Sequence, residues 1–102
     1  MTDLEYIRSR LDLGERLAQL AEEATELAHA ALKLRRAYTG DNPTPVSAYD
    51  AFELLLEEVA DVSTCLDTLE IYGNIERRRV ACLTETKMSR WATRLTEEAA
   101  KG

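Results

Sequence analysis

Two pairs of acidic residues in this chain share a spacing of three, Glu23 with Glu26 and Glu58 with Asp61. Residues three apart project from the same side of a helix. Glu58 also lies within the largely apolar run LLLEEVADV (54–62), where a charged carboxylate is costly unless something compensates it. If the two helices pack antiparallel, the four carboxylates meet and repel one another, and a hard divalent cation removes the repulsion. The two pairs together therefore predict a Mg²⁺ site, in which Mn²⁺ can substitute.

A simpler interpretation needs no metal. Acidic residues three apart are common here, because the same spacing occurs at Asp12/Glu15, Asp50/Glu53 and Asp67/Glu70. Such pairs usually decorate a solvated helix face. An arginine such as Arg35 or Arg90 would also neutralise Glu58. The two interpretations stay open at the level of single residues, and the presence of both pairs on neighbouring helices favours the metal.

The elements that must position these pairs are helices. Gly and Pro are few and mark two breaks, at residues 40–45 and at Gly73-Asn74. Between the breaks the apolar period is helical, so we expect helices over about 3–13, 14–38, 47–72 and 74–98. Thr2 or Asp3 caps the first, Ser47 the third and Asn74 the fourth, with Gly73 just past the end of the third. The expected apolar stripe of the second helix is Leu17, Leu20, Ala24, Leu27, Ala31 and Leu34. The predicted fold is an all-α antiparallel bundle of about four helices, in one domain spanning residues 1–102.

Composition narrows the classes of partner. The chain has 102 residues, of which 45% are hydrophobic and 31% charged, and its formal net charge is −6. This balance argues against a nucleic acid or an anionic membrane as the main partner. No stretch approaches the roughly 20 apolar residues of a membrane span, and the first residues do not read as a signal peptide. We expect a cytoplasmic protein in which Cys65 and Cys82 are free, buried thiols.

The acidic pairs also carry a family resemblance. EEATE (22–26) followed by EEVAD (57–61) resembles the EExxE…ExxD signature of the MazG-like, all-α nucleoside triphosphate pyrophosphohydrolases. The resemblance extends from about Leu17 to Leu95, includes NPTP (42–45) and KMSRWATRL (87–95), and is strongest to the short phage and bacterial members. The gap between the two half-motifs is longer here than is usual in that family.

This resemblance implies a reaction. It implies Mg²⁺-dependent hydrolysis of a (deoxy)nucleoside triphosphate, between its α- and β-phosphates, to a nucleoside monophosphate and pyrophosphate. Glu22 or Glu57 would orient the attacking water or accept its proton. The resemblance also implies a homodimer or homotetramer, which the broad apolar arcs of the second and third helices favour as well. The metal ligands carried over from the family are Glu23, Glu26, Glu58 and Asp61.

Cations for the outer phosphates must come from other residues. Lys87, Arg90 and Arg94 recur at helical spacing in the fourth helix, and similar positions in relatives contact phosphate. Lys87 and Arg90 are therefore the leading substrate-binding candidates, with solvated helix charges as the alternative. Lys33, on the same side of the second helix as Glu26, is a weaker candidate.

Two other functions compete with this one. Glu26 and His29 form the ExxH motif of ferritin-like di-iron proteins, and a homodimer would add Glu58. That arrangement leaves Glu23 and Asp61 without a role, and on the helical wheel His29 lies nearly opposite the apolar stripe. The third hypothesis is a non-catalytic helical assembly module, for which Glu58→Gln is tolerated.

Overall fold

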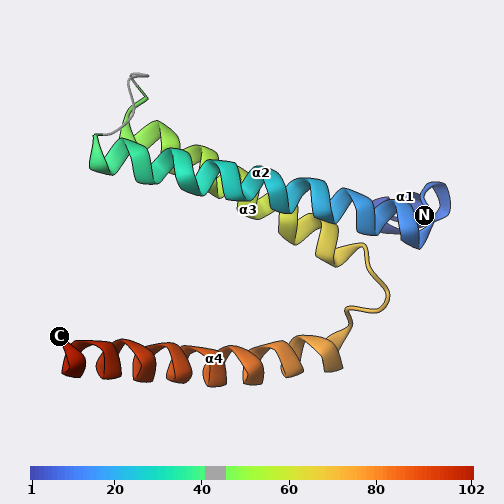
Figure 1. Cartoon of the computed structure of the whole chain (residues 1–102). Helices are drawn as coiled ribbons and strands as arrows, with labels where there is room; N and C mark the ends of the chain where they lie inside the picture. Colours follow the sequence, from blue (N-terminus) through green and yellow to red (C-terminus); the bar gives the residue numbers. More distant parts are fainter. Residues whose placement is uncertain (41–45) are drawn as a thin grey trace. The chain divides into compact units, whose positions relative to one another are not determined.

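The computed structural model describes residues 1–40 and 46–102, and over these residues the chain is all-α (Figure 1). The helices are α1 (Asp3–Arg10), α2 (Leu13–Thr39), α3 (Ala48–Asp67) and α4 (Asn74–Lys101), which confirms the predicted fold class. The predicted loop falls almost entirely on 41–45, outside the described residues. The chain divides into two compact units, Met1–Glu70 and Ile71–Gly102.

Local sequence signals set where the first three helices begin. The hydroxyl of Thr2 accepts a hydrogen bond from the Glu5 amide at 3.1 Å, as predicted for the start of α1. Asp12 caps α2 through the Glu15 amide at 2.7 Å, and Ser47 caps α3 through the Asp50 amide. These side chains satisfy amide groups that have no partner within the helix. α2 ends at Gly40, whose φ of 76° is a left-handed conformation that glycine adopts without strain.

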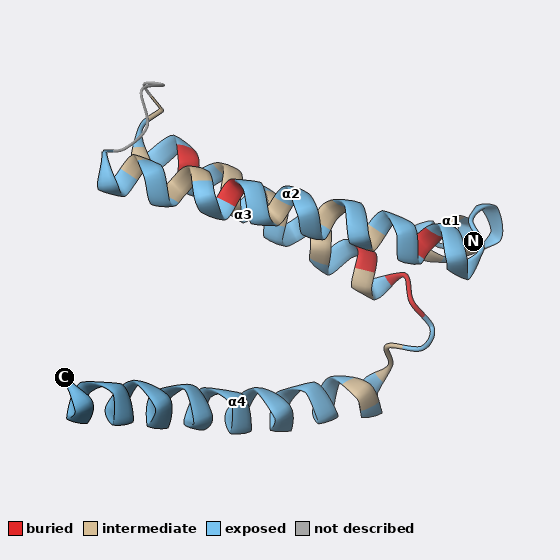
Figure 2. Ribbon diagram, viewed as in Figure 1, coloured by how far each residue is buried: buried red, intermediate tan, exposed pale blue. Residues whose placement is uncertain are grey.

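Helices α2 and α3 pack as an antiparallel hairpin (Figures 1 and 2). The buried and half-buried positions between them alternate at spacings of three and four, as in a coiled-coil seam. The residues of this seam are Arg16, Leu20, Glu23, Leu27, Ala30, Leu34 and Ala37 in α2, and Ala48, Ala51, Leu55, Glu58, Val62, Cys65 and Leu69 in and just after α3. Each helix thus contributes one glutamate to an otherwise mostly apolar seam.

The seam corrects the predicted apolar stripe of α2. Three of its leucines lie in the seam as expected, but Leu17, Ala24 and Ala31 are exposed. The prediction selected apolar residues, whereas the packing period of 3.5 residues selects Glu23 and Ala30 instead.

Helix α3 ends at Asp67, five residues earlier than the predicted Tyr72. The Arg16 guanidinium, which is buried, donates to the carbonyl of Thr68, and Arg8 Nε donates to the same oxygen at 2.9 Å. Both arginines also pair with the Glu70 carboxylate, at 2.9 Å for Arg16 and 3.2 Å for Arg8. Cations at a helix C-terminus satisfy its free carbonyl groups and complement its dipole. The end of α3 is therefore fixed by residues far away in the sequence.

The second unit consists of α4 and the short segment before it. Gly73, predicted to follow the third helix, is instead the N-cap of α4, and its amide donates to the Glu76 carboxylate at 3.0 Å. α4 extends three residues beyond the predicted Glu98, to Lys101. None of the helices in the described part of the chain is both long enough and apolar enough to cross a bilayer.

Candidate metal centre

Three carboxylates from the two hairpin helices meet at one point. Glu23 of α2 and Glu58 and Asp61 of α3 each offer an oxygen, and these oxygens lie within 4.8 Å of one another. Glu23 and Glu58 are half-buried seam residues, and Asp61 is exposed beside them. The antiparallel packing of α2 on α3 brings together members of two acidic pairs that are about 35 residues apart in the chain.

Glu58 is the least compensated of the three. Its Oε2 atom is buried and has no hydrogen-bond partner among the described residues. Burial raises the pKa of the Glu58 carboxyl above its usual value, and the charges of Asp61 and Glu23 raise it further. Among the described residues, Arg35, which belongs to the same unit, forms no ion pair with Glu58, and Arg8 and Arg16 pair with Glu70.

The other predicted carboxylates surround this group without belonging to it. Glu26 and Glu57 are exposed, and the charges of both contribute to the raised pKa of Glu58. Glu22 is exposed on α2. Three of the four predicted ligands therefore converge, and Glu26 lies one turn from Glu23 on the rim of the group.

Two residues beside this group were not predicted from the sequence to lie there. Gln19 Nε2 donates to Glu23 Oε1 at 3.0 Å, which holds that carboxylate in place from one turn earlier in α2. Cys65 is buried one turn after Asp61, and burial, followed by the charges of Glu23 and Asp61, raises the pKa of its thiol. Their spacing of four from Glu23 and Asp61 was the signal that could have identified them. Cys82 is free as predicted but exposed, not buried.

The group opens on one side of the hairpin. Glu26, Lys33 and Asp61 each directly precede a seam residue, and in an antiparallel pair such positions of the two helices lie on the same side. Lys33 is half-buried two turns after Glu26. This side of the hairpin therefore combines the carboxylates with the Lys33 ammonium group. His29 is exposed and is not one of the three converging residues.

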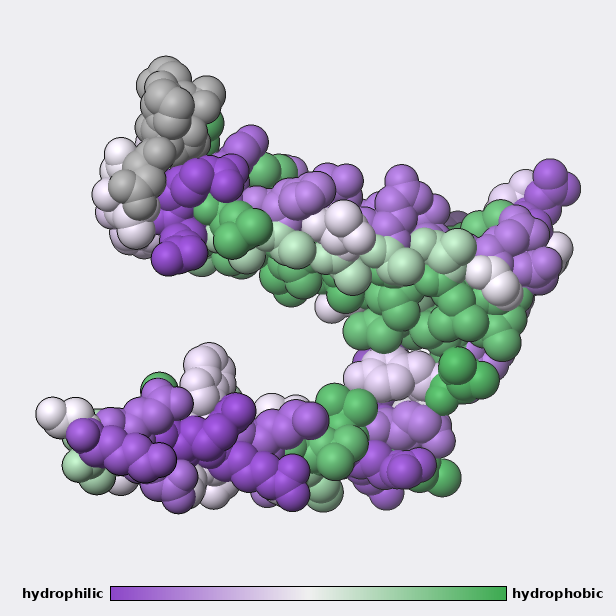
Figure 3. Space-filling view, in the orientation of Figure 1, coloured by the Kyte–Doolittle hydropathy of each residue, from purple (hydrophilic) through white to green (hydrophobic). Residues whose placement is uncertain are grey.

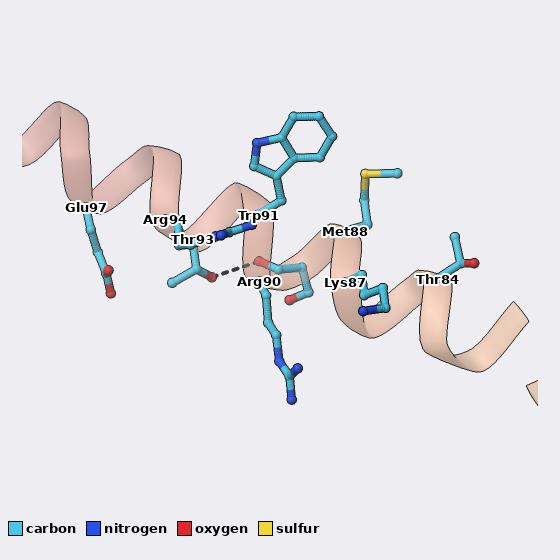
Figure 4. A pocket seen from close by; sticks show the side chains of 9 residues that line it. Thr84, Lys87, Met88, Arg90, Trp91, Thr93, Arg94 and Glu97 are labelled. Atoms are coloured by element: carbon cyan, nitrogen blue, oxygen red, sulfur yellow. Dashed lines mark hydrogen bonds between the residues drawn. The ribbon is translucent and has the colours of Figure 1, made fainter. Parts of the chain in front are cut away.

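The remaining substrate-binding candidates belong to the second unit. Lys87 and Arg90 are exposed on α4, along a surface that they line together with Trp91 and Arg94 (Figure 4). Met88 and Trp91 project from one side of the helix and Arg90 from the opposite side. A single helix does not enclose a ligand, so the pocket along α4 is an open hollow lined in part by these cations.

The chemistry of the three converging residues fits a hard divalent cation. They supply only carboxylate oxygens, the ligand type that Mg²⁺ takes. Their mutual repulsion, and the buried Glu58 Oε2 atom without a hydrogen-bond partner among the described residues, favour a bound positive charge.

Comparison with protein-family models, with curated proteins and with solved structures yields no match to this chain.

Proposed function

We propose that this protein is a Mg²⁺-dependent nucleoside triphosphate pyrophosphohydrolase. The observation that carries the proposal is the unpartnered carboxylate of Glu58, which meets Glu23 and Asp61 inside a helical seam. A seam position normally favours an apolar residue, so two glutamates there indicate a role other than packing. The reaction itself comes from the resemblance of EEATE (22–26) and EEVAD (57–61) to the MazG-like signature.

In this proposal Glu23, Glu58 and Asp61 hold the cation, and Glu26 completes the set from the rim. Gln19 orients Glu23 through its hydrogen bond. Bound Mg²⁺, or Mn²⁺ in its place, would neutralise the charge of the phosphate oxygens and of the leaving pyrophosphate. The dense negative charge of these residues would otherwise repel a triphosphate.

The chain's other residues then have distinct tasks. Glu22 or Glu57 accepts the proton of the attacking water, whose oxygen bonds to phosphorus while the α–β anhydride bond breaks. The products are a nucleoside monophosphate and pyrophosphate. Lys33, Lys87 and Arg90 bind the phosphates, because ammonium and guanidinium groups donate strong hydrogen bonds to phosphate oxygens. A homodimer or homotetramer in the cytoplasm, without nucleic acid, is part of the same proposal.

The metal is tested first by thermal unfolding. Mg²⁺ that binds only the folded chain raises the midpoint, and a chelator reverses the rise. A chain with Glu23, Glu26 and Glu58 changed to Gln and Asp61 changed to Asn should lose this response. An unchanged midpoint of the wild-type chain in millimolar Mg²⁺ would refute the metal site. Coloured, stoichiometric iron would favour the di-iron hypothesis instead.

The reaction is tested with a panel of canonical and modified NTPs and dNTPs, with the products separated by chromatography. We expect monophosphate and pyrophosphate in equal amounts. Glu58→Gln should lower kcat and not only raise KM, because it removes an interaction needed in the transition state. Release of orthophosphate would refute the assigned cleavage position. No turnover with Mg²⁺ or Mn²⁺ would leave the assembly module as the better description.

A further inference from the structure

Trp91 is the only tryptophan of the chain, and it lies in the open hollow along α4 (Figure 4). It is 57% exposed, although tryptophan is on average a well-buried residue. Its indole projects away from the helix, and no arginine or lysine in the described part of the chain lies over the ring. By contrast, the Arg77 guanidinium lies 4.5 Å from the centre of the Tyr72 ring. The Trp91 ring is therefore accessible to a planar ligand.

Unpaired cations border this ring. Lys87 precedes Trp91 by four residues and Arg94 follows it by three, so both lie one turn away on the same face of α4. Neither Lys87 nor Arg94 forms an ion pair within the described part of the chain. The hollow is lined by one further cation, Arg90, and by one carboxylate, Glu97, so its lining has a net positive charge. It combines an aromatic face with a site for an anion.

A nucleotide matches this combination. Its base has a π-face that stacks on an aromatic side chain, and its phosphates accept charge-assisted hydrogen bonds from lysine and arginine. One helical turn, about 5.4 Å, separates Trp91 from each of the two cations, and the long side chains of Lys87 and Arg94 extend across that distance. The cations alone would bind any polyphosphate, so the ring is the feature that indicates a ligand with a base.

Two other occupants match this surface less well. The visible face of α4 is mostly hydrophilic, in contrast to the hydrophobic band along the hairpin, so an apolar protein contact does not account for the cations (Figure 3). Single-stranded nucleic acid also combines bases with phosphates. Residues 71–102 carry 7 basic and 4 acidic side chains, but residues 1–70 carry 15 acidic and 6 basic ones, so the chain as a whole repels a long polyanion. A free nucleotide carries far less charge.

We propose that the base of the nucleotide stacks on Trp91, with Lys87 and Arg94 bound to its phosphates. This inference rests on the proposed function for the kind of substrate, and it adds how the base is recognised. Stacking uses the π-face that every base has and reads none of the hydrogen-bonding edges. The site therefore distinguishes a nucleotide from bare polyphosphate but only weakly distinguishes one base from another.

The first test follows the fluorescence of Trp91, which is specific to this residue because the chain has no other tryptophan. The probe is the α,β-methylene analogue of ATP with Mg²⁺, which the proposed reaction does not cleave, and tripolyphosphate is the control without a base. We expect the analogue to quench the fluorescence saturably and tripolyphosphate to reverse the quenching. Unchanged fluorescence in the analogue, or equal quenching by tripolyphosphate alone, would overturn the proposal. So would a single-stranded oligonucleotide that quenches at lower concentration than the analogue.

The second test measures affinity by calorimetry. Trp91→Leu should bind the analogue at least about fivefold more weakly, the lower end of the effect of base stacking, and should bind tripolyphosphate as the wild-type chain does. Trp91→Phe keeps a ring and should retain most of the affinity. Leu95→Ala, a 54% exposed position of α4 outside the hollow, is the control and should bind both ligands normally. If Trp91→Leu weakens both ligands equally, or neither, Trp91 does not bind the base.

These measurements separate the inference from the proposed reaction. Turnover of nucleoside triphosphates by a chain whose Trp91 fluorescence ignores the analogue would overturn the stacking and leave the reaction standing. Quenching by the analogue without turnover of any nucleoside triphosphate would support the stacking and count against the hydrolysis.

Discussion

At the scale of single residues, Glu58 places a carboxylate in a half-buried position that favours an apolar side chain, which is unfavourable in a protein without a bound cation. It occupies a seam position where Leu, Ala or Val would pack, yet its Oε2 atom has no hydrogen-bond partner among the described residues. Its pKa is raised by burial and by the neighbouring carboxylates, so the charged form is disfavoured in the folded chain. Such a residue lowers the stability of the metal-free protein and contributes only when a cation is bound.

A substitution at Glu58 should separate these two effects. In chelator, Glu58→Gln should raise the thermal midpoint, because it removes a poorly solvated charge and keeps the size of the side chain. In Mg²⁺ the order should reverse, since only the wild-type chain gains binding energy. Glu53→Gln, an exposed change on the same helix, should alter neither midpoint. A Glu58→Gln chain with an undiminished Mg²⁺ response would remove Glu58 from the site.

Glu70 shows the opposite shift and predicts acid sensitivity. The hydrogen bond from Arg16 lowers the pKa of its carboxyl most, with further lowering by its own backbone amide and by the charges of Arg16 and Arg8. A depressed pKa gives stability that is present above the unfolded value of about 4.5 and is lost as the pH falls below it. Urea midpoints measured from neutral to acid pH should therefore fall less steeply for Glu70→Gln. In an Arg16→Met background the same substitution should have little further effect on the slope.

At the scale of elements, the hairpin depends on contacts at the end of α3. Arg16 reaches from the start of α2 to the Thr68 carbonyl and the Glu70 carboxylate, and its Nε also donates to the Leu11 carbonyl at 3.1 Å. One buried side chain thus joins the segment before α2 to the segment after α3. These contacts join the two helices at this end of the seam and favour the register in which Glu23 lies opposite Glu58.

Removal of this arginine should cost stability. Arg16→Met leaves the buried carbonyl of Thr68 with fewer donors, for which the expected loss in the free energy of unfolding is about 1–3 kcal/mol. Urea unfolding measures the loss, with the exposed Arg35→Met as the control on the same helix. If the two variants unfold at the same urea concentration, Arg16 does not fix the end of the hairpin.

At the scale of the whole molecule, the charges divide between the two units. Residues 1–70 have a net charge of −9, and residues 71–102, with 7 basic and 4 acidic side chains, have +3. The carboxylates proposed to bind the cation belong to the first unit, and Lys87 and Arg90, proposed to bind phosphate, belong to the second. Metal binding and nucleotide binding should therefore respond to different substitutions.

The double change Lys87→Ala and Arg90→Ala tests this division. It should leave the Mg²⁺-induced rise of the thermal midpoint unchanged and raise KM for the nucleotide by roughly tenfold to a hundredfold, the value of charge-assisted hydrogen bonds. Arg78→Ala with Arg79→Ala, on the same helix, is the charge-matched control. A double variant with the wild-type KM would exclude Lys87 and Arg90 as phosphate contacts.

The sequence by itself determined the helical class, the caps at Thr2 and Ser47, and the candidate carboxylates, because each depends on neighbours within one or two turns. It did not determine which apolar residues form the seam: Leu17, Ala24 and Ala31 have the right chemistry and yet lie outside it. Nor did it predict that α3 stops at Asp67, since the arginines that satisfy its last carbonyls come from more than 50 residues earlier.

The convergence of Glu23, Glu58 and Asp61, and the separation of Glu26 from them, likewise required the tertiary structure. Spacing in the chain fixes only the side of a helix on which a residue lies, and the register between α2 and α3 decides which carboxylates meet.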